Sequence, residues 1–291
     1  MFQAEDRFID VDGVRTRYWA AGDRGSPVVL VHGIACVIEH WEQNFEALSK
    51  HHRVFALDLV GCGLSDKHID FDYSFGSLAS FVLDFMSAVG LEKAHLIGFS
   101  LGGNLVLRCA AQAPERVLSV VTADPACVGP KLAMFLRLAK VRGLGELLTW
   151  PSRFGTKSFV KSAFVDGSVI ATMKIDRFTE LARQPGAQAA FLKMLRSDGS
   201  FSDPCGTKQL AEIQSLLPKV CCRVQVIWGR QDAFVPANHA DILKQLLPQC
   251  ELVLYEDCGH LPQIEQQAKF DADVLRFIER PDEGGQRKTY S

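Results

Sequence analysis

The sequence lacks both a long apolar run and an excess of charge of one sign. None of its hydrophobic stretches approaches the roughly 20 residues that a transmembrane helix needs, so we expect no membrane-spanning segment. Its first six residues show no basic stretch leading into an apolar one, so a secretory signal is not expected either. The formal net charge is −2 over 291 residues. This balance indicates neither a nucleic acid nor an anionic membrane as a partner.

Paired cysteine motifs are also missing. The nine cysteines form no C-x-x-C pair, and two of them, Cys221 and Cys222, are adjacent. This spacing suits neither a disulfide framework nor a zinc site. We therefore interpret the cysteines as small, buried, hydrophobic residues of a reduced, cytoplasmic protein. The sequence contains no metal-ligand pattern and no phosphate-binding glycine loop, so we expect no metal and no cofactor.

What is present is an alternation of short apolar runs with segments of helical spacing. Residues 7–18 alternate apolar and polar positions around Asp12-Gly13, which predicts a β-hairpin. The later apolar runs are continuous, as in strands that are buried on both faces. The alternation predicts a mostly parallel sheet covered by helices on both sides. The expected strands are 27–31, 53–57, 95–99, 118–123, 224–229 and 251–255, and the expected helices are 41–48, 73–90, 101–113, 239–247 and 270–278.

Between residues 125 and 218 the strand pattern stops. This region is rich in Leu, Phe, Ala and Met and has only helical spacing and connectors. We expect it to be a helical cap inserted between two strands of a core domain that comprises residues 1–124 and 219–280. The tail, 281–291, is polar and contains glycine, and we expect it to be disordered.

An apolar run, a G-x-S-x-G pattern and a helical segment follow one another at 95–113. This order predicts a nucleophile elbow, in which Ser100 lies on a strained turn and Gly98 and Gly102 allow a close backbone approach. The pattern is short, and the alternative is a serine that only caps the following helix. The residues that accompany it decide between the two.

A serine hydroxyl becomes a nucleophile when a base takes its proton and a third group orients that base. Asp232 and His260 each follow a predicted strand downstream of Ser100. Because the carboxyl ends of parallel strands meet at one edge of a sheet, we expect these three residues to lie together. Asp124 also follows a predicted strand and is the alternative acid. We interpret Asp257 as a solvated loop carboxylate, and as surface histidines His51, His52, His68, His95 and His239.

Five segments together resemble the α/β-hydrolase superfamily of serine hydrolases, in its capped esterase, lipase and C–C hydrolase branch. The resemblance covers roughly residues 7–280 and implies the α/β-hydrolase fold. The segments are His-Gly-Ile at 32–34, Asp-Leu-Val-Gly-Cys-Gly-Leu-Ser at 58–65, Gly-Phe-Ser-Leu-Gly-Gly at 98–103, Gly-Arg-Gln-Asp at 229–232 and Gly-His-Leu-Pro at 259–262.

The resemblance implies an oxyanion hole formed by the backbone N–H groups of Ile34 and Leu101. A serine at position 100 separates the chain from the dehalogenase and epoxide hydrolase branches, which carry aspartate there. His32 is expected to be structural, with a direct catalytic role as the weaker alternative. The residues expected to support the site are His32, Gly33, Gly98 and Gly102.

The function that these residues predict is hydrolysis of a carboxylic ester, with Ser100 as nucleophile, His260 as base and Asp232 as its orienting acid. The alternatives are a C–C hydrolase of a dienoic ring-cleavage product, a perhydrolase side activity, and a ligand receptor with slow turnover. The expected substrate is a small to medium apolar acyl or aromatic compound, because the cap supplies apolar bulk through Met134, Phe135, Leu138, Trp150, Phe154, Phe159, Phe164, Phe178, Phe191 and Met194. Four basic cap residues are expected to form a solvated face, with recognition of a substrate carboxylate as the alternative: Lys131, Arg137, Lys140 and Arg142.

Overall fold

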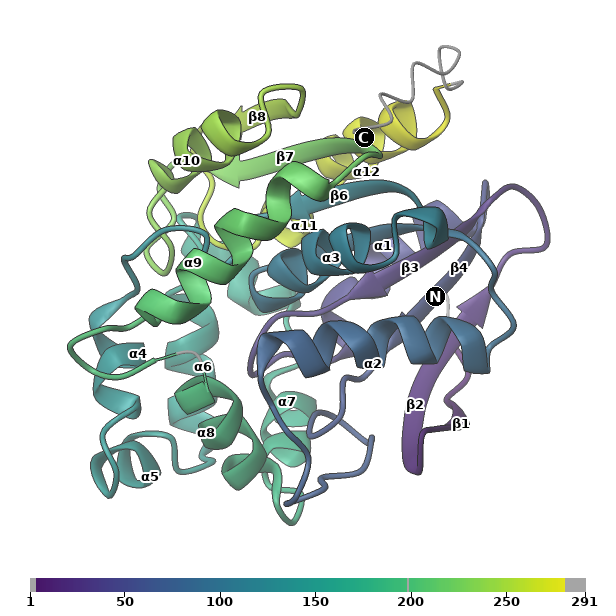
Figure 1. The fold of residues 1–291 in the computed structure, drawn as a ribbon. Helices are drawn as coiled ribbons and strands as arrows, with labels where there is room; N and C mark the ends of the chain where they lie inside the picture. The colour runs from purple at the N-terminus through teal and green to yellow at the C-terminus, as the bar shows by residue number, and fades with distance from the viewer. Residues whose placement is uncertain (1–3, 198, 281–291) are drawn as a thin grey trace.

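The continuous apolar runs form the centre of an eight-stranded sheet with the order β1-β2-β4-β3-β5-β6-β7-β8 (Figure 1). The computed structural model describes residues 4–197 and 199–280. The hairpin pairs β1 with β2 and β2 with β4 in antiparallel fashion, and every other pairing is parallel. The strands are β1 (Arg7–Val11), β2 (Val14–Ala21), β3 (Pro27–Val31), β4 (Arg53–Leu57), β5 (Ala94–Phe99), β6 (Val117–Ala123), β7 (Arg223–Gly229) and β8 (Glu251–Tyr255).

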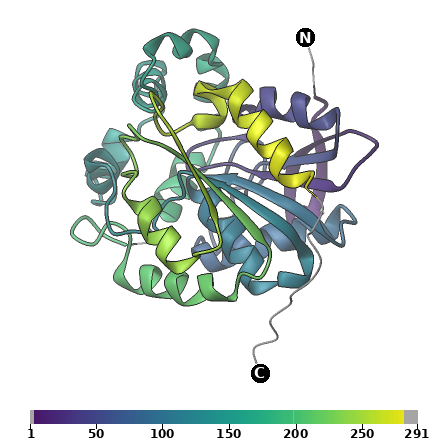
Figure 2. The same ribbon diagram turned by 90° about the horizontal axis from the view of Figure 1, so that it is seen from above.

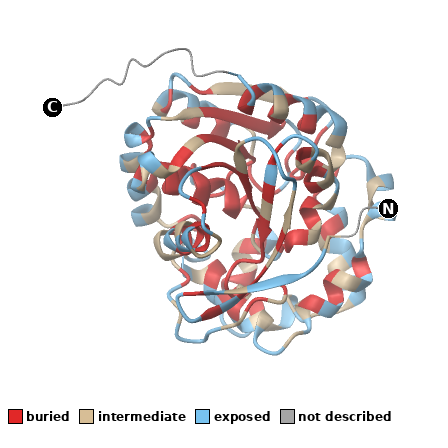
Figure 3. Cartoon of the chain, turned by 90° about the vertical axis from the view of Figure 1, so that its right-hand side faces the viewer, coloured by how far each residue is buried: buried red, intermediate tan, exposed pale blue. Residues whose placement is uncertain are grey.

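Helices cover both faces of this sheet. One layer contains α1 packed against α12, and the opposite layer contains α2 packed against α3 (Figure 2). The central strands can therefore be apolar on both sides, and every residue of β5 is buried. Figure 3 shows the buried residues gathered in the sheet and on the helix faces against it. The core helices are α1 (Glu42–Ser49), α2 (Phe75–Ala88), α3 (Leu101–Gln112), α10 (His239–Leu246), α11 (Pro262–Glu265) and α12 (Gln267–Ile278), with short 3-10 turns at Ile38–Trp41 and Pro114–Arg116.

In its described residues, 124–197 and 199–222, the segment between β6 and β7 contains no strand; it forms a group of helices at one end of the molecule, at the lower left of Figure 1. One of its helices differs from the others: α9 packs against α3, where Glu212 pairs with Arg108 at 2.8 Å. The division into core and cap stays a prediction; α9 falls inside the predicted cap, 125–218, but packs on the core helix α3. The helices are α4 (Met134–Ala139), α5 (Leu144–Leu148), α6 (Arg153–Lys161), α7 (Ile175–Ala182), α8 (Ala187–Ser197) and α9 (Thr207–Leu216), with 3-10 turns at Gly167–Thr172 and Leu217–Lys219.

Two further predictions concern membrane-spanning helices and the C-terminal tail. Within residues 4–197 and 199–280, no helix is both long and apolar enough to cross a membrane. The tail for which we expect disorder, 281–291, lies outside the described residues.

Three histidines that we expected at the surface are buried, and that expectation was wrong. His95 lies inside because its two ring nitrogens hydrogen-bond the hydroxyls of Ser119 and Ser26, at 2.7 and 2.9 Å. The other two are His52 and His239, while His51 and His68 are exposed as expected. A polar ring can be buried wherever neighbouring strands supply partners, and a sequence pattern does not show those partners.

The interpretation of the basic and cysteine residues also needs correction. Lys140 is buried, not solvated, and its ammonium group donates to the backbone carbonyl of Leu195. Among the cysteines, Cys221 is exposed and Cys62 and Cys222 are half-buried; the other six are buried as expected.

Candidate active site

The turn between β5 and α3 has the geometry of a nucleophile elbow. Ser100 has φ +54° and ψ −120°, a strained backbone for a residue with a side chain. Its N–H donates to the Ala123 carbonyl at 2.9 Å, which holds the turn against β6. A Cβ atom at Gly98 would lie 2.3 Å from the Gly102 carbonyl oxygen, and one at Gly102 would lie 2.2 Å from that of Val31. Both positions therefore require glycine.

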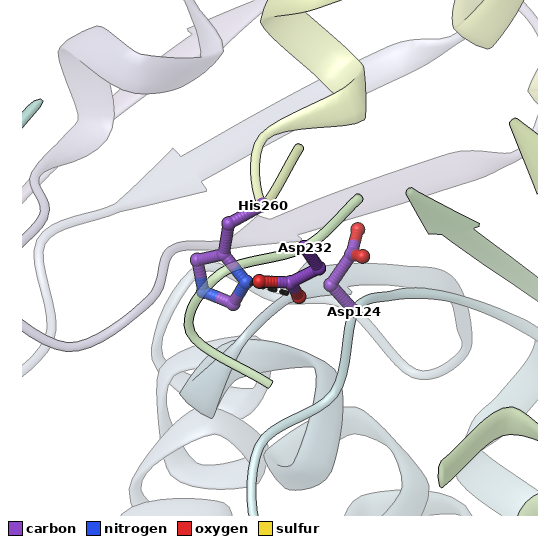
Figure 4. A group of neighbouring side chains, drawn as sticks. All are labelled: Asp124, Asp232 and His260. Carbon is purple, nitrogen blue, oxygen red and sulfur yellow. Dashed lines mark hydrogen bonds and ion pairs between the residues drawn. The ribbon is translucent and has the colours of Figure 1, made fainter. Parts of the chain in front are cut away.

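His260 and Asp232 come together from the loops after β8 and β7 (Figure 4). His260 Nδ1 lies 2.7 Å from Asp232 Oδ2. The other oxygen, Asp232 Oδ1, accepts hydrogen bonds from the backbone N–H groups of Phe234 at 2.7 Å and Val235 at 3.0 Å. These two bonds fix the carboxylate, so that Oδ2 faces the imidazole.

Asp124 lies beside this pair but does not contact the imidazole through a hydrogen bond. It follows β6, is buried, and accepts a hydrogen bond from the Gly229 N–H at 2.9 Å. Figure 4 shows Asp232 between His260 and Asp124. Burial and the neighbouring Asp232 carboxyl raise the pKa of Asp124 well above its usual range, which favours the neutral acid. Asp257 is exposed, as expected of a loop carboxylate.

Ser100 and His260 both line a cavity of about 50 Å³. Ile34 and Leu101 line the same cavity. Leu101 is the first residue of α3, where a backbone N–H has no partner within the helix. Gly33 lies directly against Ser100, because a Cβ atom at position 33 would be 2.9 Å from Ser100 Cβ.

His32 holds the loop that carries Ile34. Its Nδ1–H donates to the Gly33 carbonyl at 2.8 Å, and its Nε2 accepts the Leu59 N–H at 3.0 Å. Burial lowers the pKa of His32 and keeps the ring neutral, as these two bonds require. Both ring nitrogens are occupied by the backbone, so the geometry agrees with a structural role.

A second cavity, of about 300 Å³, lies between the cap helices and the loops after β3 and β4. It shares wall residues with the first cavity: Cys36, His40, Leu136, Phe159 and Val160. Among residues 4–197 and 199–280, no Lys, Arg, Asp or Glu lines either cavity. Six of the ten cap residues singled out for their bulk line the larger one: Phe135, Trp150, Phe159, Phe178, Phe191 and Met194. None of the four basic cap residues does.

Two residues near the site carry no sequence pattern that marks them. His40 lines both cavities and stacks on Phe178 with ring centroids 4.3 Å apart. Burial lowers its pKa to about 4, so the ring is neutral at physiological pH. Glu265 ties the His260 loop to the cap, because it accepts the N–H groups of Gly259, Val165 and Asp166 at 2.6 to 2.7 Å.

Within the part of the chain that the structure describes, Asp124, Asp232 and His260 are the one group of His, Cys, Asp or Glu side chains close enough to share a metal ion. The direct bond between His260 and Asp232 occupies the two ligand atoms that face each other. The donor set therefore fits a proton-transfer site better than a metal centre.

Residues 26–267 match the family model of the alpha/beta hydrolase fold. The chain belongs to the α/β-hydrolase family. This confirms the resemblance and the fold class expected from the sequence. The hydrolase is 31% identical over 273 residues to the dihydrolipoyllysine-residue acetyltransferase component of the acetoin cleaving system of Cupriavidus necator, covering 94% of this chain and 68% of that protein.

Two further similarities are to hydrolases of Pseudomonas species. A 2-hydroxy-6-oxononadienedioate/2-hydroxy-6-oxononatrienedioate hydrolase of a Pseudomonas species is 27% identical over 265 residues, which cover 89% of this hydrolase and 90% of that protein. The structure of the meta-cleavage product hydrolase of Pseudomonas fluorescens IP01 superposes with a TM-score of 0.79 at 27% identity. That match covers 94% of this hydrolase and 97% of the other chain.

Proposed function

We propose that this hydrolase cleaves carboxylic esters through an acyl-enzyme. Ser100 Oγ attacks the ester carbonyl while His260 takes its proton, and Asp232 holds the imidazole in the required tautomer. The N–H groups of Ile34 and Leu101 stabilise the oxyanion. His260 then protonates the leaving alcohol, and a water activated by His260 releases the acid. The hydrogen bond of 2.7 Å between His260 and Asp232, beside a cavity that Ser100 also lines, is the observation that supports this assignment.

The proposed substrate carries an uncharged, apolar acyl or aromatic group. The larger cavity has room for such a group and is lined by apolar and aromatic side chains, with only a few polar groups such as His40 and Gln188. Because none of the charged residues that the structure describes lines either cavity, a neutral group loses little when it leaves water for this site. In this proposal, helices α4–α8 form the cap that shapes the cavity.

The lack of charged side chains among the described cavity-lining residues also makes the C–C hydrolase the weaker alternative. The relative named for a nonadienedioate acts on a compound with two carboxylates. A carboxylate buried without a cation or hydrogen-bond donors is strongly disfavoured, and in the described part of the chain no lysine or arginine lines either cavity. The four basic cap residues considered for carboxylate recognition lie outside both cavities.

A substrate panel tests the proposal. p-Nitrophenyl esters with acyl chains from two to twelve carbons are compared with a dienoate ring-cleavage product, using the wild type and Ser100→Ala. We expect turnover of the esters by the wild type only, with a preference for medium chains. Turnover of the dienoate at a higher kcat/KM would support the C–C hydrolase. Labelling by a fluorophosphonate without appreciable turnover of any ester would instead support a receptor.

A further inference from the structure

The segment 144–154 displays large apolar side chains to solvent. Leu147 is 74% exposed, Leu148 53%, Trp150 70% and Phe154 83%. Monomeric proteins seldom leave so many neighbouring large apolar side chains uncovered unless something docks there.

This segment is held in place and is not a loose strand of chain. Glu146 pairs with Arg196 of α8 at 2.8 Å, and Gln188 of the same helix donates to the Glu146 carbonyl at 2.7 Å. Ser152 caps α6 by accepting the Gly155 N–H at 3.0 Å. The backbone is thus fixed at both ends while the apolar side chains remain exposed.

The exposed segment is also a wall of the larger cavity. Leu148 and Trp150 both line that cavity and are exposed on their outer side. An apolar compound that reaches the outer face of this segment is therefore next to a cavity that shares wall residues with the one lined by Ser100. Leu147 and Phe154 lie on the same segment but line neither cavity.

Positive charge surrounds the apolar residues. Between residues 131 and 165 the chain has seven basic residues and a single acidic one, Glu146, although its overall formal charge is −2. Arg142, Arg153, Lys157 and Lys161 are exposed. Arg153 pairs with Asp176 at 2.5 Å and Glu146 pairs with Arg196, which leaves Arg142, Lys157 and Lys161 as the exposed cations of this stretch that form no ion pair among the described residues.

We infer that the 144–154 segment docks on the surface of an anionic phospholipid bilayer and takes an acyl ester from it into the cavity. Exposed Trp, Phe and Leu side chains beside Lys and Arg are the composition that binds at the interface of a membrane. A second copy of the chain fits this face less well, because a two-fold contact would bring two positive surfaces together. The substrate part rests on the proposed ester hydrolysis, whereas the docking part does not.

Flotation with vesicles tests the docking without any turnover. The full chain is mixed with phosphatidylcholine vesicles and with phosphatidylcholine–phosphatidylglycerol vesicles, and bound protein is measured at low and high salt. We expect binding to the anionic vesicles only, weakened by salt. Leu147→Ser with Phe154→Ser should reduce the partition roughly tenfold or more, because both apolar side chains lose their burial. Turnover of a water-soluble short ester should stay within twofold of wild type.

A matched pair of charge reversals tests the electrostatic part. Lys157→Glu on the cap should weaken vesicle binding by about fivefold for each of the two charges changed. Lys93→Glu makes the same change in net charge at an exposed position just before β5, at the opposite end of the strands from Ser100, and should leave binding unaltered.

Three results would overturn the inference. The first is equal binding by wild type and the Leu147/Phe154 double variant. The second is no binding to either kind of vesicle. The third is that the wild type sediments as a dimer and the double variant as a monomer, which would assign the face to a second copy of the chain. Loss of ester turnover in the wild type with vesicle binding intact would instead overturn only the proposed function.

Discussion

Replacement of Asp232 by asparagine should slow ester turnover by roughly 10,000-fold, the loss expected when a triad histidine is held in the wrong tautomer. This corresponds to about 5.4 kcal/mol of transition-state stabilisation. The structure explains why the loss should be so large. The N–H groups of Phe234 and Val235 both donate to Asp232 Oδ1, so the amide oxygen of an asparagine must stay in that position.

The amide NH2 group of Asn would then take the place of Oδ2, opposite His260 Nδ1. Because NH2 is a donor, Nδ1 would have to become the acceptor, and the ring proton would move to Nε2. Nε2 is the atom that must accept the proton of Ser100. The variant should therefore remain folded, bind substrate and fail in the chemical step.

Asp124→Asn is the matched control, because it makes the same chemical change in the adjacent carboxyl. Asp124 is held towards its neutral form, and a neutral amide oxygen can still accept the Gly229 N–H. Turnover should fall by less than about tenfold, since no bond to His260 is lost. The sign of its effect on stability also follows. Because the pKa of Asp124 is higher in the folded state than in the unfolded state, the free energy of unfolding of the wild type decreases as the pH rises above the unfolded-state pKa of about 3.9. The melting temperature of Asp124→Asn relative to wild type should therefore increase with pH.

Steady-state kinetics with p-nitrophenyl butyrate, together with circular dichroism of each variant, provide the assay. A kcat for Asp232→Asn above a tenth of wild type, combined with a loss of more than 1,000-fold in a folded Asp124→Asn, would refute the reasoning. That pattern would assign the orienting acid to position 124.

The remaining predictions concern the nucleophile, a cavity histidine, the cavity volume and the elbow. Ser100→Ala should abolish labelling by a fluorophosphonate and reduce ester turnover by several orders of magnitude, and undiminished labelling would remove Ser100 from the mechanism. Because burial lowers the pKa of His40 to about 4, the free energy of unfolding of the wild type should decrease as the pH falls from about 6.5 through 4. In urea denaturation at pH 5, the decrease for His40→Gln should be about 2 kcal/mol smaller than that for the wild type. Ala182→Phe fills part of the larger cavity and should lower kcat/KM for long-chain esters at least tenfold while a short ester is little changed; an unaltered chain-length profile would contradict the assignment of that cavity to the acyl group. Gly102→Ala would place a methyl group 2.2 Å from the Val31 carbonyl oxygen and should destabilise the fold by on the order of 3 kcal/mol, which a normal melting temperature would contradict.

Much of the architecture could be read from the sequence because local chain geometry decides it. A continuous apolar run can be a strand only where both faces are covered, and the runs at 27–31 and 53–57 are strands over the same residues in the structure. The nucleophile elbow could be predicted equally well. Glycine is required at 98 and 102 because backbone segments are in contact there, and the residue type shows this requirement directly.

The hydrogen-bond partners of polar side chains could not be predicted from the sequence in this way. His95 and Lys140 were expected at the surface, yet each finds an acceptor or donor on another element and is buried. Asp124 and Asp232 both follow strands and could not be told apart by position. Only the packing of the loops shows that Asp232 meets His260 while Asp124 bonds the Gly229 N–H.

The predicted cap also shows which features depend on the sequence alone and which depend on the tertiary structure. The sequence by itself predicted that 125–218 lacks strands, as the described residues 125–197 and 199–218 do, and that it is rich in apolar side chains, because composition and periodicity are properties of the chain alone. It did not determine that Phe178 and Met194 line the cavity, that Phe154 faces water, or that α9 packs on α3. Nor did a net charge of −2 reveal that exposed basic residues lie along the same stretch of chain as the exposed apolar side chains of 144–154, since that sum averages over surfaces that are far apart in the fold. Which side of a short helix is covered depends on what packs against it, and only the tertiary structure decides that.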